Sequence, residues 1–108
     1  MNVEDIRNYA LQKEDVSEGF PFDADTLVLK TSNKMFMLIS LDAAELQVNL
    51  KCDPDKAMEL REQYPNYVLP GYHMNKKHWN TVVVNGLKTE LIKEMIDDSY
   101  RWVSKTKK

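Results

Sequence analysis

The sequence is poor in cysteine and glycine, and these scarcities exclude several classes of protein. Cys52 is the single cysteine among 108 residues, so the chain cannot form an internal disulfide. The three glycines have neither the Gly-x-Gly-x-x-Gly nor the Gly-x-x-x-x-Gly-Lys spacing, which excludes nucleotide binding through loops of those two types. No apolar run approaches the ~18 residues of a membrane span. The first residues, Met-Asn-Val-Glu-Asp, are acidic where a secretory signal is basic, so we expect a cytoplasmic protein that does not enter a membrane.

The composition is that of one globular domain, and the charge is unevenly distributed along it. Hydrophobic residues make up 43% and charged residues 30% of the chain, and we expect a single domain spanning residues 1–108. The formal net charge is −2. Residues 1–50 hold nine acidic and four basic side chains, whereas residues 51–108 hold eight acidic and eleven basic ones. The second half can therefore carry a basic face, which favours an anionic partner.

Hydrophobic periodicity predicts three helices and four strands. The helices are expected over residues 3–13, 54–64 and 89–104, and the strands over residues 26–31, 35–41, 45–51 and 81–84. The resulting order is α-β-β-β-α-β-α, without a repeated strand–helix–strand alternation. This order predicts an α+β two-layer sandwich, with an antiparallel sheet of at least four strands and helices mainly on one face.

Local signals fix several junctions and part of the core. Asp53-Pro54 predicts a helix start, because aspartate caps the free amides and proline suits the first helical position. Ser32-Asn33-Lys34 predicts a tight hairpin with Asn33 at positive φ. Residues 14–25 are expected to form a loop whose Phe20 and Phe22 plug one end of the core. The residues expected to be nearly inaccessible are Leu38, Val48, Leu60, Val83 and Ile96.

The histidines and the cysteine do not form a recognisable metal or catalytic motif. His73 and His78 are five residues apart, outside the i, i+4 spacing of helical zinc ligands, and no Cys-x-x-Cys accompanies Cys52. We expect Cys52 to be a small residue closing a strand end rather than a nucleophile. The sequence therefore favours a non-enzymatic protein without a metal or other cofactor.

The stretch 67–84 is the densest in side chains that could bind a ligand. Pro70-Gly71 predicts a turn, after which polar residues lead into an apolar strand. Lysines neutralise phosphates, asparagine bonds base edges or phosphate oxygens, and aromatic or imidazole planes stack on bases. The predicted nucleic-acid-binding surface consists of Lys51, His73, Asn75, Lys76, Lys77, His78 and Trp79.

The chain resembles the MmcQ/YjbR family over nearly its full length. The family's blocks occur in order as Phe20-Pro21-Phe22-Asp23, Lys34-Met35-Phe36, Leu50-Lys51-Cys52-Asp53-Pro54, the run from Pro70 to Val82, and Asp98-Ser99-Tyr100. Asn33 stands where members often have glycine, but asparagine also tolerates a left-handed conformation.

The resemblance implies a DNA-binding protein of the double-wing type, with a fold similar to the frataxin/CyaY group. The matching site positions are Lys51, His73, Asn75, Lys76, His78 and Trp79, which coincide with the surface expected from their chemistry. We expect weak, salt-sensitive binding of DNA by a monomer. The alternative is a small protein-interaction or stress-related adaptor in which Lys51, His73 and Trp79 brace one another.

Overall fold

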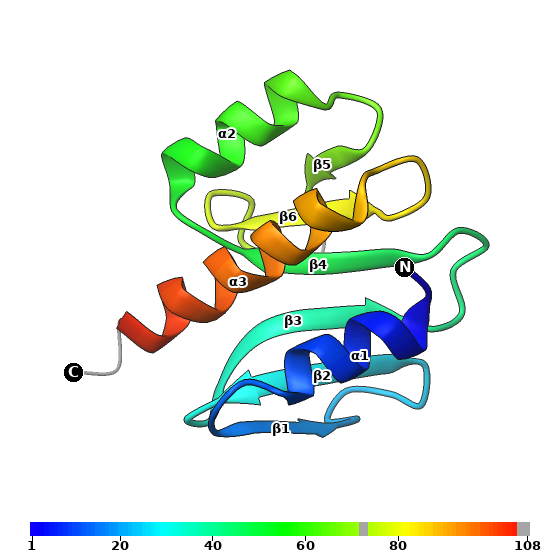
Figure 1. The fold of residues 1–108 in the computed structure, drawn as a ribbon, viewed down its shortest axis with the longest axis vertical. Coiled ribbons are helices and arrows are strands. Elements are labelled where there is room, and N and C mark those ends of the chain that lie inside the picture. Colours follow the sequence, from blue (N-terminus) through cyan, green and yellow to red (C-terminus); the bar gives the residue numbers. More distant parts are fainter. Residues whose placement is uncertain (72–73, 106–108) are drawn as a thin grey trace.

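The structure is a computed structural model that describes residues 1–71 and 74–105. These residues form a six-stranded antiparallel sheet with strand order β1-β2-β3-β4-β6-β5 and three helices (Figure 1). The strands are Val16–Gly19 (β1), Thr26–Thr31 (β2), Lys34–Ser40 (β3), Gln47–Lys51 (β4), Val68–Pro70 (β5) and Trp79–Val83 (β6). The helices are Val3–Leu11 (α1), Pro54–Gln63 (α2) and Thr89–Lys105 (α3). None of them is long and apolar enough to cross a membrane.

The helices cover one face of the sheet, as the sequence predicts. Helices α1 and α3 lie across the sheet, and α2 packs beside β5 and β6 (Figure 1). The main core lies between these two layers and includes Ile6 from α1, Leu60 from α2 and Ile96 from α3. The exposed fractions of the five predicted core residues are 5% for Leu38, 0% for Val48, 7% for Leu60, 8% for Val83 and 0% for Ile96. The α+β two-layer prediction and the predicted core are therefore confirmed.

Two short edge strands and one loop differ from the prediction. β1 and β5 are absent from the predicted strands, and they pair with β2 and β6 at opposite edges of the sheet. The prediction that Phe20 and Phe22 plug the core is wrong, since they are 52% and 61% exposed. Pairing of β1 with β2 takes the chain along the sheet edge, and the phenylalanines follow the end of β1 at the surface.

The predicted hairpin turn at Asn33 and the predicted cap at Asp53 are confirmed, whereas the turn predicted at Pro70-Gly71 is wrong: Pro70 ends β5, and the Gly71 backbone N–H still donates to the Trp79 carbonyl at 3.0 Å. Asn33 has a φ of 66° and Ser32 one of 51°, which is the pattern of a type I′ hairpin turn. The Asp53 carboxylate accepts the backbone N–H of Asp55 at 2.8 Å and that of Lys56 at 3.4 Å. The first helix ends at Leu11, two residues earlier than expected.

The sheet face opposite the helices carries a second, smaller apolar cluster. Val28 of β2, Leu38 of β3 and Trp79 of β6 are buried together there, with Met35 and Met74 packed against them. Lys51 pairs in register with Trp79 and so lies on this same face. The second apolar cluster therefore lies on the same sheet face as Lys51 and next to it.

Candidate nucleic-acid interface

An open groove of about 640 Å³ lies where the β2–β3 hairpin, the end of β4, the start of β6 and the last turns of α3 meet. Among the described residues it contains three lysines, two tryptophans and a histidine, and none of these lining residues carries a carboxylate. The lining residues are Lys30, Asn33, Lys34, Met35, Lys51, His78, Trp79, Trp102 and Val103. We call this surface the lysine groove. Its composition combines positive charge with aromatic rings.

Lys51 is held at the groove by both its backbone and its side chain. Its backbone N–H donates to Ser99 Oγ on α3 at 3.0 Å. Its Nζ lies 5.9 Å from the ring centroid of Trp79, its register partner on β6, a cation–π distance. The next backbone N–H, that of Cys52, donates to the carbonyl of His78 at 2.8 Å. Three contacts thus fix the end of β4, and they restrict the positions that the Lys51 ammonium can reach.

The predicted loop forms a turn organised by Asn75. Asn75 Oδ1 accepts the backbone N–H of Lys77 at 2.9 Å, and the Asn75 carbonyl accepts those of His78 and Trp79 at 3.1 and 3.0 Å. Asn75, Lys76 and Lys77 are exposed but do not line the groove. Asn75 therefore shapes the turn with its amide oxygen. His73 lies outside the described residues.

His78 and Trp102 form the accessible aromatic wall of the groove. Their ring centroids are 6.2 Å apart with an interplanar angle of 28°, a stacked arrangement. His78 Nδ1 is buried and has no hydrogen-bond partner among the described residues. Trp79, by contrast, is only 5% exposed and belongs to the second apolar cluster. The partly buried Trp102 is thus better placed than Trp79 to stack on a ligand.

The sequence reasoning missed six of the described groove residues: Lys30, Asn33, Lys34, Met35, Trp102 and Val103. The hairpin signal at Ser32-Asn33-Lys34 could have suggested that Lys30 and Lys34 lie together at one end of β2 and β3. For Trp102 the available signal was a tryptophan beside the buried stripe of an amphipathic helix. Neither signal shows that these segments approach His78.

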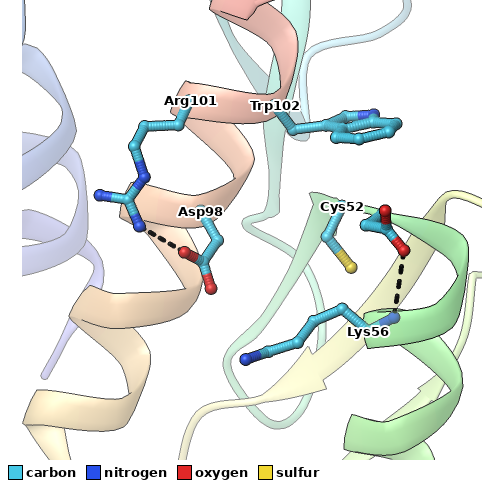
Figure 2. A pocket seen from close by; sticks show the side chains of 6 residues that line it. Cys52, Lys56, Asp98, Arg101 and Trp102 are labelled. Carbon is cyan, nitrogen blue, oxygen red and sulfur yellow. Dashed lines mark hydrogen bonds and ion pairs between the residues drawn. The ribbon is translucent and has the colours of Figure 1, made fainter.

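A second cavity of about 300 Å³ adjoins the groove and shares Trp102 with it. We call it the Asp98 cavity, and Figure 2 shows the side chains around it. It is lined by Cys52, Asp53, Lys56, Asp98, Arg101 and Trp102. Asp98 Oδ1 accepts from Arg101 Nη2 at 2.5 Å, one turn along α3.

Cys52 in this cavity is not an activated thiol. Burial raises its pKa to about 11, and the nearby carboxylates of Asp98 and Asp53 act in the same direction. The thiol is therefore protonated near neutral pH and a poor nucleophile. Within residues 1–71 and 74–105 no group of three histidine, cysteine or acidic side chains could hold a metal ion.

The chain is similar to a group of bacterial proteins. The family model described as YjbR matches residues 11–102. The chain is 38% identical over 101 residues to the uncharacterized protein YbdF of Escherichia coli O157:H7, covering 93% of this chain and 82% of that protein. It is 32% identical over 95 residues to the uncharacterized protein YyaQ of Bacillus subtilis, covering 75% and 79% of the two chains.

Solved structures agree with the fold described above. The crystal structure of protein DR2400 from Deinococcus radiodurans, with a domain of family model DUF419, matches with a TM-score of 0.91 and 38% identity, over 96% of this chain and 79% of that chain. A crystal structure of a protein from Pseudomonas syringae matches with a TM-score of 0.76 and 29% identity, over 94% and 97% of the two chains.

Proposed function

Since the chain belongs to the YjbR family, we propose that it binds DNA without catalysing a reaction, as the resemblance to that family implies, and that the lysine groove is the contact surface. The observation that carries the proposal is the composition of the groove. Lys30, Lys34 and Lys51 line it together with two tryptophans and His78, and no carboxylate from residues 1–71 or 74–105 lines it. A chain with a net charge of −2 gathers positive charge and aromatic rings at one place.

The groove suits an unpaired strand better than a duplex. Trp102 and His78 lie in a concave surface, where a base could stack only if its face were free. Bases inside a duplex have both faces covered by their neighbours. The three lysines that line the groove would contact the phosphates of a strand crossing it. The ligand that matches this arrangement is single-stranded DNA.

The expected binding is weak and depends on salt. In single strands each neutralised phosphate contributes about −0.7 to the slope of log affinity against log salt concentration, so three lysines give a slope of about −2. The acidic first half of the chain repels the same polymer, which lowers the affinity further.

Fluorescence anisotropy with a labelled 12-nucleotide thymidine strand, and with a duplex of mixed sequence, tests the proposal at several salt concentrations. Lys51→Gln and Lys30→Gln should weaken binding, and each should reduce the magnitude of the salt slope by about 0.7. Lys88→Gln is the matched control, because Lys88 is exposed and does not line the groove. Trp102→Ala should weaken binding by ~1–3 kcal/mol and leave the slope unchanged.

Circular dichroism melting should show that each variant is folded at the assay temperature. If the unmodified protein binds neither DNA with salt sensitivity, the proposal fails. If Lys88→Gln weakens binding as much as Lys51→Gln, the lysine groove is not the contact surface.

A second candidate, a small protein-interaction adaptor, is favoured by a different surface. Phe20, Phe22 and Leu41 are 52%, 61% and 43% exposed. Contiguous exposed apolar patches are typical of protein-interaction sites, and Phe20 and Leu41 line one open pocket together. In this case Asn75 and Trp79 would serve only the turn and the second apolar cluster. Phe22→Ser would then abolish partner capture, while Lys51→Gln would leave it unchanged.

A further inference from the structure

The Asp98 cavity lies next to the lysine groove, and Trp102 forms part of both. In Figure 2 the Trp102 indole lies at the upper right and the ends of the Asp98 and Lys56 side chains lie to its lower left, with Cys52 between them. A volume of about 300 Å³ is at the lower end of the range for small-ligand pockets. A strand in the groove would therefore pass the mouth of a cavity of about the right size for one planar group.

The cavity offers a hydrogen-bond acceptor and a donor that the described part of the chain does not use. Asp98 accepts a hydrogen bond through Oδ1 from Arg101, and no described residue donates to its other carboxylate oxygen. The Lys56 ammonium has no carboxylate within ion-pair distance in residues 1–71 and 74–105. Both groups lie at the cavity and are only partly exposed.

The balance of charges selects the class of ligand. Two carboxylates, from Asp53 and Asp98, disfavour a phosphate or another anion, whereas Lys56 and Arg101 disfavour a cation. A neutral ligand with neighbouring hydrogen-bond donors and acceptors can bond both to the carboxylates and to the cationic side chains. The Trp102 indole favours a planar ligand, on which it can stack. A nucleobase has all these properties.

We propose that the Asp98 cavity receives one unpaired base of the bound strand and prefers guanine, an inference that rests on the proposed DNA binding. Guanine carries two neighbouring donors, N1–H and the N2 amino group, beside the acceptor O6. The two Asp98 carboxylate oxygens accept from the two donors, Oδ1 through the lone pair that Arg101 does not use, and the Lys56 ammonium donates to O6. Adenine would place its unprotonated N1 against the carboxylate, and the pyrimidines carry only one such donor on this edge.

The inference is tested with thymidine 12-mers that carry one central guanine, inosine, adenine or cytosine. Anisotropy at low salt should show about tenfold tighter binding of the guanine strand than of the adenine strand. Inosine, which lacks the N2 amino group, should fall between them. Asp98→Asn should reduce the guanine preference severalfold, because the amide replaces an acceptor with a donor, while affinity for the all-thymidine strand changes little.

Glu94→Gln is the matched control, since it removes one negative charge from an exposed position one turn earlier on α3. It should leave the guanine preference intact, and Lys56→Gln should lower it. Melting curves establish that the variants are folded.

Two failures are distinguishable. If all strands bind equally well, or if the preferred base is not guanine, the base cavity is overturned while the proposed function stands. The same holds if Asp98→Asn keeps the full guanine preference. If no strand binds, the proposed function itself fails.

Discussion

Ser99 is a buried hydroxyl whose removal should destabilise the protein strongly. Its exposed fraction is 0%. Its Oγ donates to the carbonyl of Phe36 on β3 at 2.5 Å and accepts the backbone N–H of Lys51 on β4 at 3.0 Å. Ser99→Ala would leave both backbone groups without this partner. Each buried group left unsatisfied costs about 1–3 kcal/mol, so the expected loss in the free energy of unfolding for the two groups is about 2–6 kcal/mol.

The chain offers a matched control on the same helix. Ser104 Oγ is also buried, but it has no hydrogen-bond partner within the described ranges. Ser104→Ala removes the same atom without breaking a bond, and we expect a change of at most about 0.5 kcal/mol in either direction. The difference between the two variants therefore isolates the hydrogen bonds from the loss of a hydroxyl as such.

Urea denaturation followed by circular dichroism gives both values. The Ser99→Ala midpoint should fall while the slope m stays unchanged, because the native surface area is the same. A parallel thermal scan should show a melting temperature lower by at least about 8 °C. If Ser99→Ala and Ser104→Ala cost the same, the bridging role of Ser99 is refuted.

Three further predictions concern the core and the titrating groups. Ile96→Ala should cost ~2–5 kcal/mol in chemical denaturation as a core cavity, and a loss well below this would contradict its complete burial. Cys52 should react slowly with iodoacetamide at pH 7 and rapidly once urea unfolds the chain, because its pKa is raised to about 11; equal rates would contradict that burial. Burial raises the pKa of Asp97, but hydrogen bonds from Lys13 and Tyr9 outweigh it and hold the pKa below its ordinary value of 3.8. The ionised carboxylate therefore stabilises the fold fully at pH values above 3.8, and this stabilisation is lost as the pH falls through the lowered pKa of the folded protein. Asp97→Asn should thus reduce the free energy of unfolding at pH 7 and change it little at pH 2, as measured by urea titration.

Elements with a strong local pattern were predictable from the sequence. β4 alternates between inward and outward residues, and the burial of Val48 and Leu50 between partly exposed neighbours follows from that period. The cap at Asp53 and the turn at Asn33 each depend on a few adjacent residues. In these places local chemistry and the final fold favour the same conformation.

The short edge strands lack such a pattern. β5 has three residues and ends in Pro70, which tolerates an edge position but does not predict one. β1 has only four residues, and its two central residues, which point to opposite faces of the sheet, are both exposed. Their pairing with β2 and β6 is decided by tertiary contacts. The exposure of Phe20 and Phe22 follows from the same pairing and could not be read from their hydrophobicity.

The candidate site was predictable only where its residues are close in sequence or share the family's blocks. Lys51, His78 and Trp79 were identified and do line the lysine groove. Lys30 and Trp102 join them from segments about 20 residues or more away along the chain, and only the sheet order and the path of α3 bring them together. Residue chemistry thus indicated the kind of ligand, while the shape of the site required the fold.

Helix α3 links the core to the proposed binding surface. Ser99, on its buried side, holds the backbone of Lys51 through a hydrogen bond. The Lys51 side chain emerges on the opposite sheet face, over Trp79. One turn after Ser99, Trp102 reaches the groove and stacks on His78. A rigid helix thus positions both a cation and an aromatic ring, so ligand binding at the groove and the stability of the core should respond together to changes in α3.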